Sequence, residues 1–470
     1  MGHAAKIGII GAGISGLATA YYLLQESLRQ NLEIEVTILE RSDRLGGVIW
    51  SEKTEGFLIE GGPQNFVTFK PQILELIKEL GLGDEVMGSN DQLRQTFVLQ
   101  DSRLQPLPQG MEFLSPVRVR PFWSSSLIST QGKLRAFLEP LVRPSSGDMS
   151  VEAFLTRRLG RELTEKVAEP LVSAIYGGDI RDLSTASALP RVYQIEQKFG
   201  SLWKGMRRTS RQRSSSSQPA FLTLRPGMSS LINGLTEQLS EISIHRNVVD
   251  IQVRWDSSCY RLKSSSSEDA FDSLVLSTPA SPAADIVDPV SSEAAHVLRQ
   301  IPYFSTVIVY LAYKEGEFTH PLNGHGFVVP RKEATVIDAC TWVSSKFEGR
   351  CPPDTVLLRC SIQDGRHRRA EISDQEAVQK VHNELQRILG ITCQPVFTRV
   401  LHARKALPQL TLGHAQRLDQ ISRALKGHPG LFLTGAYFGG VGMPDCIETA
   451  RRTAQQVVDF VKSPLAQNGI

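Results

Sequence analysis

The chain begins with a short apolar run, a glycine-rich turn and a helical pattern of apolar residues. Residues 7–10 form the continuous apolar run that is typical of a strand buried on both faces. After the turn, apolar residues recur at helical spacing and predict one apolar helix face, made of Leu17, Tyr21, Leu24 and Leu28. Residues 34–39 form a second apolar run. Together these elements predict a βαβ unit.

Strand-like and helix-like patterns return after residue 221. Apolar runs predict strands at residues 242–253, 273–277, 306–313, 326–329, 356–361 and 431–434. Helices are predicted to begin near Ser229 and Asp445, the second of them after a further glycine turn. We therefore expect one cofactor-binding domain that combines the N-terminus, a middle segment and the C-terminus.

The region between these parts has a different character. Helical periodicity from about residue 83 to residue 185 predicts an inserted helical segment. The basic, serine-rich residues 207–217 (RRTSRQRSSSS) predict a surface loop. Residues 117–123 mix cations with amphipathic aromatic side chains. They indicate either an interfacial segment or an ordinary surface loop with a buried Trp123.

Composition narrows the class of protein. A chain of 470 residues is too long for one ordinary core, so several substructures are expected. The net charge of +3 is too small to favour nucleic-acid binding. The six cysteines include no C-x-x-C pair, which gives no support to a metal site and favours free thiols in a reducing compartment. No secretory signal and no apolar run of about 18 residues is visible, so we expect a cytoplasmic protein without a transmembrane helix.

The turn after the first predicted strand has the pattern G-x-G-x-x-G, in Gly11-Ala12-Gly13-Ile14-Ser15-Gly16. Gly11 permits the tight turn, Gly13 lets the backbone approach a pyrophosphate, and Gly16 lets the helix lie close to the strand. The helix N-terminus then presents free N–H groups and its positive dipole end to the phosphates. The strand and amphipathic helix on either side supply the context that this pattern requires.

The residues after the second predicted strand point to FAD. Glu40 follows Gly16 at the distance expected of the acid that binds the ribose hydroxyls. Residues 41–47 (RSDRLGG) then contain an R-x-G-G doublet, which is typical of FAD enzymes related to amine oxidases. Arg44 can reach charged groups of the cofactor there. Residues 60–65 (EGGPQN) resemble the segment that passes the flavin ring in these enzymes.

Later motifs narrow the resemblance. Residues 433–447 (LTGAYFGGVGMPDCI) resemble the closing FAD motif, G-A-x-x-x-G-V-G-x-x-D-C-I, of protoporphyrinogen and coproporphyrinogen III oxidases. Residues 174–179 (AIYGGD) with 183–184 (LS), residues 193–198 (YQIEQK), and residues 408–409 (PQ) with 412–414 (LGH) resemble further segments of that family, in the same order. The resemblance spans almost the whole chain and is closest to the short bacterial enzymes.

The resemblance implies a fold of the α/β and α+β classes. It comprises a discontinuous Rossmann-type FAD-binding domain with a mixed-sheet substrate domain and an inserted helical domain. Residues 1–72, 222–290 and 395–470 would form the FAD-binding domain. Residues 73–88, 186–221 and 291–394 would form the substrate-binding domain, and residues 89–185 the helical, membrane-associating domain.

The resemblance also implies residue roles. Those that would contact FAD are Gly11, Ala12, Gly13, Ile14, Ser15, Gly16, Glu40, Arg41, Arg44, Gly46, Gly47, Gly62, Pro63, Gln64, Asn65, Val249, Gly435, Ala436, Val441, Gly442 and Met443. Those that would line the substrate cavity are Lys70, Arg94, Ala174, Ile175, Val328 and Ile337. Lys70 matches a lysine of the short bacterial members and would meet either a substrate carboxylate or a cofactor phosphate.

Some positions depart from the family pattern. Ala174 stands where glycine is usual, Ala403 stands where tryptophan is frequent, and Thr96 falls near the position of a propionate-binding arginine, which Arg94 could replace. No acid–base constellation is identifiable, because His402 and His414 read as structural. A flavin oxidation does not require one.

The implied activity is the six-electron oxidation of coproporphyrinogen III, or of protoporphyrinogen IX, with dioxygen as acceptor and hydrogen peroxide as product. Implied partners are the porphyrinogen, dioxygen, a membrane surface reached from the cytoplasm, and a ferrochelatase that receives the product; the protein would be a monomer or homodimer. Two alternatives remain: a flavin amine oxidase or carotenoid desaturase, and a non-catalytic tetrapyrrole carrier that kept the fold.

Overall fold

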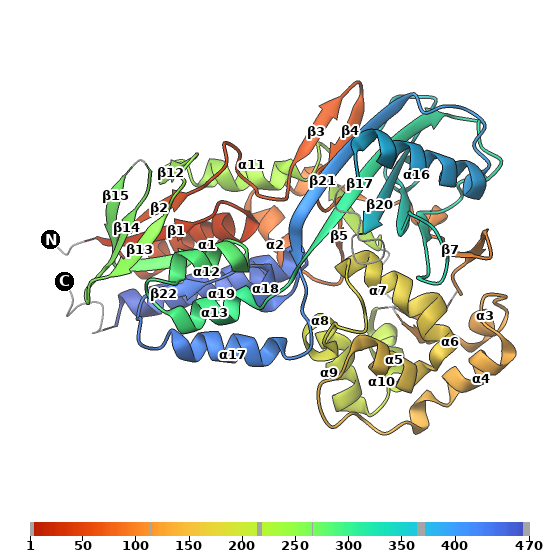
Figure 1. Cartoon of the computed structure of the whole chain (residues 1–470), viewed down its shortest axis with the longest axis horizontal. Helices are drawn as coiled ribbons and strands as arrows, with labels where there is room; N and C mark the ends of the chain where they lie inside the picture. The colour runs from red at the N-terminus through yellow and green to blue at the C-terminus, as the bar shows by residue number, and fades with distance from the viewer. Residues whose placement is uncertain are drawn as a thin grey trace.

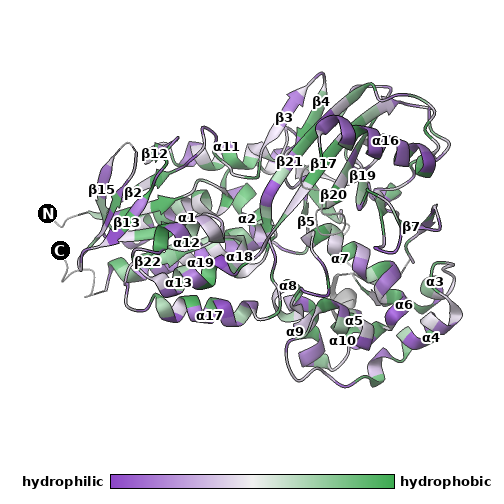
Figure 2. Ribbon diagram, viewed as in Figure 1, coloured by the Kyte–Doolittle hydropathy of each residue, from purple (hydrophilic) through white to green (hydrophobic). Residues whose placement is uncertain are grey.

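The computed structural model describes residues 4–108, 110–112, 114–213, 219–265, 267–363 and 372–463. One lobe contains a sheet covered by helices on both faces, a second contains a larger sheet, and a third is built of helices (Figure 1). The helices that cover the sheets, such as those labelled α16 and α17, alternate between hydrophilic and hydrophobic residues along their length (Figure 2). That alternation gives each of them one face to bury.

The first lobe is built on a five-stranded parallel sheet whose strands come from distant parts of the chain. In spatial order these are β12 (Ser243–His245), β2 (Ile34–Leu39), β1 (Ala5–Ile10), β16 (Ser273–Leu276) and β22 (Leu431–Leu433). Ile7 and Ile9 of β1 face one hydrophobic cluster, whereas Ile10 faces another. β1 is therefore buried on both sides, as its apolar run predicts.

Helices and a small meander cover the two faces of this sheet. One face packs against α1 (Ile14–Gln30), α2 (Gln72–Glu79), α11 (Ser229–Gln238) and α19 (Met443–Val461). The other packs against α12 (Ala280–Val287), α13 (Ser292–Arg299), α17 (His414–Ala424) and an antiparallel meander of β13 (Gln252–Trp255), β14 (Tyr260–Lys263) and β15 (Glu268–Phe271). This is the predicted doubly covered α/β arrangement, assembled from three separate parts of the chain.

The second lobe contains a seven-stranded mixed sheet. Its spatial order is β21 (Phe397–Pro408), β17 (Tyr303–Lys314), β20 (Thr355–Gln363), β19 (Ala339–Trp342), β18 (Gly326–Val328), β7 (Thr96–Gln100) and β8 (Arg103–Pro106). Only the β18–β7 pair is parallel among the described pairs of this sheet. α16 (Asp374–Leu389) packs on one face and closes a hydrophobic cluster there.

Short elements join the two sheets. These are the hairpin β3 (Ser51–Thr54) and β4 (Phe57–Glu60), the small sheet of β5 (Phe66–Val67), β11 (Phe221–Leu224) and β6 (Val86–Gly88), the helices α14 (Val343–Lys346) and α18 (Ala436–Gly439), and the 3-10 turns η1 (Gly83–Glu85) and η2 (Asp91–Leu93). Phe57 and Ile59 of β4 pack against Tyr310 of β17, so the hairpin belongs to the second lobe's core.

The third lobe is helical and has one hydrophobic cluster of its own. It contains the two-residue strands β9 (Met111–Glu112) and β10 (Ser115–Pro116), and the helical elements α3 (Val119–Trp123), α4 (Thr130–Phe137), η3 (Glu139–Leu141), α5 (Val151–Leu159), α6 (Arg161–Leu163), η4 (Thr164–Ala168), α7 (Glu169–Tyr176), α8 (Thr185–Ala188), α9 (Pro190–Phe199) and α10 (Leu202–Arg213). No described helix is both long enough and apolar enough to cross a membrane.

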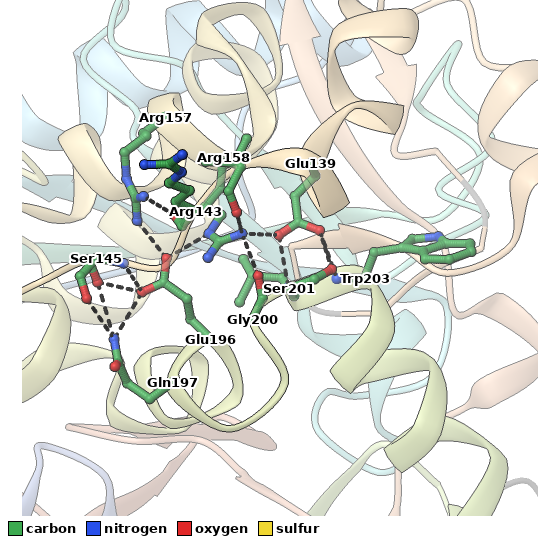
Figure 3. Close-up of polar contacts among 12 residues, drawn as sticks. Glu139, Arg143, Ser145, Arg157, Arg158, Glu196, Gln197, Gly200, Ser201 and Trp203 are labelled. Atoms are coloured by element: carbon green, nitrogen blue, oxygen red, sulfur yellow. Dashed lines mark hydrogen bonds and ion pairs between the residues drawn. The ribbon is translucent and has the colours of Figure 1, made fainter.

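A buried ion network ties the helices of this lobe together (Figure 3). Arg158 of α5 donates from Nε to Glu196 of α9 at 2.6 Å and from Nη1 to Glu139 of η3 at 3.0 Å. All three side chains are at most 1% exposed. Ser145 and Ser201 supply further hydrogen bonds to the two carboxylates. The buried charges are thus paired and hydrogen-bonded, which burial requires.

Several sequence expectations are wrong in detail. Leu28 is 73% exposed, because the buried face of α1 runs through Leu17, Tyr21 and Leu23 instead. Residues 242–253 form two short strands rather than one, since Asn247 and Asp250 take positive φ angles between them. Asparagine and aspartate tolerate that conformation, and it breaks the extended chain.

The basic segment also differs from its prediction. α10 continues through residues 207–213, and residues 214–217 lie outside the described part of the chain. Arginine and glutamine are good helix formers, so a basic run need not be a loop. Trp123 is 43% exposed and lies in a short helix, which contradicts the alternative of a surface loop with a buried Trp123.

The packing refines the expected division of the chain. β7 and β8 pair into the seven-stranded sheet, although residues 89–185 were expected to be helical. α2 packs with α1 and β1, whereas residues 73–88 were assigned to the substrate-binding part. α9 and α10 pack into the helical cluster. The domain boundaries themselves stay a prediction.

Candidate flavin site

Two helices begin side by side at the carboxyl edge of the parallel sheet. α1 follows β1 through the glycine turn, and α19 begins after Gly442, beyond β22. The two helices pack along each other (Figure 1). Gly13 and Gly442, the residues that precede the two helices, are both extended, and no described side chain caps either N-terminus. Free N–H groups at this edge are suited to an anionic ligand such as a pyrophosphate.

The glycines of the turn are needed for two different reasons: Gly11 and Gly16 let the backbone pack, and Gly13 leaves space for a ligand. A Cβ at Gly16 would lie 1.9 Å from the carbonyl oxygen of Gly11, so only glycine lets α1 pack on the turn. Gly11 itself has a φ of +103°, which disfavours any side chain. A Cβ at Gly13 would instead meet no described atom within 4 Å, and its φ of −72° suits any residue. The open space beside Gly13 fits a close ligand, which is the role predicted for it.

Glu40 links the glycine turn to the R-x-G-G segment. Its Oε2 accepts from the backbone N–H of Ala12 at 2.7 Å. Its Oε1 accepts from the N–H and the hydroxyl of Ser42 at 2.8 and 2.7 Å. The carboxylate therefore lies directly beside the turn, in the position expected of a ribose-binding acid.

The R-x-G-G segment lies against the turn. The N–H of Gly46 donates to the carbonyl of Ala12 at 2.8 Å, and a Cβ on Gly47 would lie 3.3 Å from the Cα of Gly13. The guanidinium of Arg44 donates to the carbonyl of Gly47 at 2.8 Å and so holds its own loop, and its contact with the cofactor stays a prediction. Arg41 is exposed beside them.

Residues 62–65, hereafter the 62–65 segment, cross from β4 to β5. A Cβ at Gly62 would lie 2.2 Å from the carbonyl oxygen of Val48, so the R-x-G-G loop and this segment touch. Two cations from the second lobe hold the segment. Arg359 donates to the carbonyl of Gly62 at 3.2 Å, and Lys346 donates to Oδ1 of Asn65 at 2.9 Å.

Sequence reasoning missed Lys346 and Arg359. Arg359 offered one signal, since it is a charged residue within an apolar strand. Lys346 offered none, because it lies 281 residues from Asn65 in the chain. Burial and, to a smaller extent, the positive charge of Arg359 together lower the pKa of Lys346 to about 7.

The closing motif surrounds the start of α19. Gly435 has a φ of +137° and leads into Ala436 at the start of α18, while Val441 and Gly442 are partly exposed just before α19. Lys70 donates to both carboxylate oxygens of Asp445 at 2.6 Å. The structure therefore places Lys70 at the same helix start, with a protein carboxylate as its partner.

The remaining predicted residues are spread over a wider area. Ala174 and Ile175 are exposed at the end of α7, and Arg94 is exposed after η2. Val328 packs in the helical cluster, whereas Ile337 is fully buried between the seven-stranded sheet and α16. The structure does not bring those last two into one cluster. Val249 is 40% exposed and pairs through its backbone with Ser265.

His402 and His414 have structural partners in this fold. Nε2 of His402 lies 2.7 Å from Asp374, and Nε2 of His414 lies 2.7 Å from the carbonyl of Tyr437. Burial lowers the pKa of His414, which favours its neutral form. Both positions fit the structural interpretation.

The fold and this edge of the sheet define a flavin-dependent oxidoreductase. The family model described as "Flavin containing amine oxidoreductase" matches residues 14–458. The chain belongs to this family, and its cofactor is FAD.

Relatives extend over the whole chain. A coproporphyrinogen III oxidase of Bacillus subtilis (strain 168) is 34% identical and covers 97% of this chain and 98% of its own length. Protoporphyrinogen oxidase 1 of Spinacia oleracea is 32% identical and covers 96% of this chain and 84% of its own length. A crystal structure of an Exiguobacterium sp. 255-15 protein, assigned as a protoporphyrinogen oxidase, superposes with a TM-score of 0.86 at 30% identity and covers 98% of this chain and all of its own. Reduced UDP-galactopyranose mutase (TM-score 0.71, 16% identity, 99% of this chain and 97% of its own) shares the fold alone.

Proposed function

We propose that this chain is an FAD-dependent porphyrinogen oxidase that uses dioxygen. The observation that carries the proposal is the near full-length similarity to coproporphyrinogen III oxidases, 34% and 33% identical, together with the family's flavin site. The order of motifs along the chain gives independent support. A flavin amine oxidase remains the nearest alternative, and the family membership alone would allow it.

When bound, FAD supplies the two-electron oxidation at its N5, and dioxygen is the final electron acceptor, with hydrogen peroxide as product. The chain's own residues bind and orient. The N-termini of α1 and α19 and the carboxylate of Glu40 suit the pyrophosphate and ribose of the cofactor. The 62–65 segment suits one edge of the flavin ring.

Coproporphyrinogen III is the proposed natural substrate. Three of the most similar relatives carry that name, and they are 31–34% identical to this chain. The substrate has four propionates where protoporphyrinogen IX has two, so cations at the cavity serve it better. Lys70 is 37% exposed despite its pair with Asp445, and Arg94 is 61% exposed, so both heads are open to a carboxylate. Ala174 and Ile175, exposed at the end of α7, are proposed as apolar walls, whereas Val328 and Ile337 are packed inside separate hydrophobic clusters.

We also propose contact with the cytoplasmic face of a membrane through the helical lobe. Large apolar side chains are exposed there at Val119 (47%), Trp123 (43%), Leu134 (55%), Leu138 (52%) and Leu141 (79%). Arg118 and Arg120 flank Val119. Apolar groups with adjacent cations favour anionic lipid surfaces. Contact with a membrane and hand-over to a ferrochelatase would both help with a poorly soluble porphyrin.

The function is tested by giving the purified, FAD-loaded protein each porphyrinogen separately, with amines as the comparison. Porphyrin fluorescence should rise with coproporphyrinogen III and rise more slowly with protoporphyrinogen IX. Peroxide release with a primary or polyamine, and none with either porphyrinogen, would establish the amine oxidase alternative instead.

A further inference from the structure

A buried lysine and an arginine hold the 62–65 segment from the second lobe. Lys346 ends α14 and is 8% exposed, and its Nζ donates to Oδ1 of Asn65 at 2.9 Å. The same Nζ lies 3.9 Å from the ring centre of Phe221 on β11. A cation over an aromatic face is stabilised by the ring, and a buried cation needs such support.

Arg359 of β20 acts on the neighbouring residues of the segment. Its Nη2 donates to the carbonyl of Gly62 at 3.2 Å. With the amide of Gln64 oriented so that its oxygen faces the guanidinium, Nε and Nη1 donate to it at 3.0 and 3.2 Å. Gly62, Gln64 and Asn65 are therefore each fixed by a cation from the other sheet.

No described carboxylate forms an ion pair with Lys346 or Arg359. Lys346 is instead stabilised by the Asn65 amide oxygen and the Phe221 ring. Arg359 contacts the Gly62 carbonyl and interacts at longer range with the carboxylate of Glu60. Such an arrangement is costly for stability alone, because a buried cation without a counter-ion is unfavourable. Unbalanced positive charge beside a cofactor segment is useful when negative charge develops there during the reaction.

We propose that Lys346 and Arg359 are positioning residues for the flavin, and that Lys346 is a titrating positive charge that tunes the flavin's reduction potential. This rests on the proposed location of the flavin ring beside the 62–65 segment. Positive charge near the ring favours the reduced, electron-rich cofactor and raises its potential. Arg359 supplies a permanent charge, and Lys346 supplies one that is lost as pH rises.

The pH range of this effect follows from the surroundings of Lys346. Burial and the charge of Arg359 lower its pKa to about 7. His325, before β18, packs by its ring against Phe221. Burial lowers its pKa, a hydrogen bond with the Asn90 carbonyl opposes that shift, and the charge of Lys346 adds to it. Asp91 on η2 and Arg94 just after it are the other charged neighbours of that histidine. Glu60, at the end of β4, interacts with Arg359, and burial raises its pKa. The pKa of about 7 places the change of charge of Lys346 in the neutral range.

The test measures the reduction potential of the bound FAD between pH 6 and pH 9, by anaerobic titration against a reference dye. The wild-type curve should bend near pH 7, with a higher potential on the acid side. Lys346→Met should remove the bend and lower the potential on that side, while Lys346→Arg should remove the bend and hold the potential above that of Lys346→Met at every pH. A role limited to packing would shift both variants in the same direction.

A matched control is available in Lys133, which is also 8% exposed and donates to a carbonyl, that of Trp123, at 2.6 Å. It lies in α4 of the helical lobe, and Lys133→Met should leave the potential curve unchanged. In the Lys346→Met variant we also expect the FAD dissociation constant to rise about threefold to tenfold, since a hydrogen bond to a charged donor is lost.

Asn65→Ala provides a second route if Lys346→Met folds poorly. If both residues act through one contact, the effects on FAD affinity should not add in the double variant. A wild-type curve without a bend near pH 7 would overturn the proposal. The proposal would also be overturned if the Met and Arg variants did not differ in the direction in which they shift the potential. Because no porphyrinogen is present, failure to oxidise porphyrinogens would contradict the proposed function without affecting this result.

Discussion

Lys70 and Asp445 form an ion pair across 375 residues of chain, with Lys70 Nζ 2.6 Å from both carboxylate oxygens. The pair joins the segment after β5 to the first turn of α19. Asp445 is also favoured there by the positive end of the helix dipole. Lys70 thus lies at the start of α19, within the candidate flavin site, and is partly exposed, so its role can be separated by mutation.

Lys70→Ala should raise the KM for coproporphyrinogen III, because a propionate loses its cation. Asp445→Asn should leave that KM unchanged or lower it, since Lys70 is then free for the substrate. Both variants should lower FAD affinity by at most about fivefold, the range of a partly exposed ion pair. Steady-state kinetics at several salt concentrations provides the measurement.

The salt dependence discriminates further. The attraction between Lys70 and a substrate carboxylate should weaken as ionic strength rises, so the contribution of Lys70 to KM should shrink. The KM of Lys70→Ala should lack this contribution at every salt concentration. Equal KM changes in Lys70→Ala and Asp445→Asn would show that Lys70 acts only through its ion pair with Asp445 at the start of α19.

Gly13→Ala and Gly16→Ala should separate ligand binding from folding. A Cβ at Gly13 meets no described atom, so the variant should fold normally and lose FAD. A Cβ at Gly16 meets the Gly11 carbonyl oxygen at 1.9 Å, so that variant should lose stability even without cofactor. Thermal unfolding of the apoproteins and FAD content of the purified proteins report the two effects. Normal FAD content in Gly13→Ala and in the bulkier Gly13→Val would contradict the location of the pyrophosphate.

Glu40→Ala should weaken FAD binding by about 10-fold or more, because charge-assisted hydrogen bonds of this kind contribute about 1.5–3 kcal/mol. The neighbouring Asp43→Ala is a suitable control, since that carboxylate is exposed on the same loop. Equilibrium titration of the apoprotein with FAD gives both constants. A dissociation constant within about twofold of wild type would show that Glu40 only holds its loop, through its hydrogen bonds with Ala12 and Ser42.

The motifs near the N-terminus could be predicted because their physical requirements are local. The glycines of the turn, Glu40 and the R-x-G-G doublet act within one βαβ unit, and their spacing fixes their meeting point. Residues 60–65 were singled out by their resemblance to a family segment, and their contact with the flavin stays a prediction. The supports of the 62–65 segment, Lys346 and Arg359, could not be predicted, because the chain passes through the whole helical lobe before it returns to them.

Secondary structure, too, could be predicted where it depends on local spacing and could not where it depends on distant parts of the chain. β1, β2 and α1 follow directly from hydrophobic spacing. β7 and β8 were hidden within an expected helical region, since strand pairing with β18 is a long-range interaction that spacing does not report. The Arg158 network likewise joins α5, η3 and α9 through charges that a sequence reading would place on the surface.

The buried network should control the stability of the helical lobe. Arg158→Met should lower the free energy of unfolding by about 3–5 kcal/mol, because the buried Glu139 loses its described ion-pair partner and Glu196 keeps only the partly exposed Arg157. Arg161→Met is the matched control: Arg161 is 83% exposed and pairs only with Glu165 among the described carboxylates, so little change is expected. Urea unfolding followed by circular dichroism measures both. Similar losses of unfolding free energy in Arg158→Met and Arg161→Met would contradict the large contribution assigned to the buried ion pairs.

The same network predicts a pH dependence. Burial opposes ionisation of Glu196, but hydrogen bonds from Ser145 and Arg158 outweigh it and lower its pKa. A carboxyl with a lowered folded-state pKa contributes stability above its unfolded pKa of about 4.3 and loses it as pH falls. Stability measured between pH 3 and pH 7 should therefore fall on the acid side. The fall should be smaller in Arg158→Met.

The most direct test of the central claim is the stoichiometry of peroxide to porphyrin with coproporphyrinogen III in air. Removal of six electrons in pairs by a flavin requires about three molecules of hydrogen peroxide for each coproporphyrin III formed. The FAD-free Gly13→Val protein should form neither product above the non-enzymatic rate. Enzyme-dependent porphyrin without peroxide, equal rates with the FAD-free variant, or no porphyrin from an FAD-loaded protein would each contradict the account.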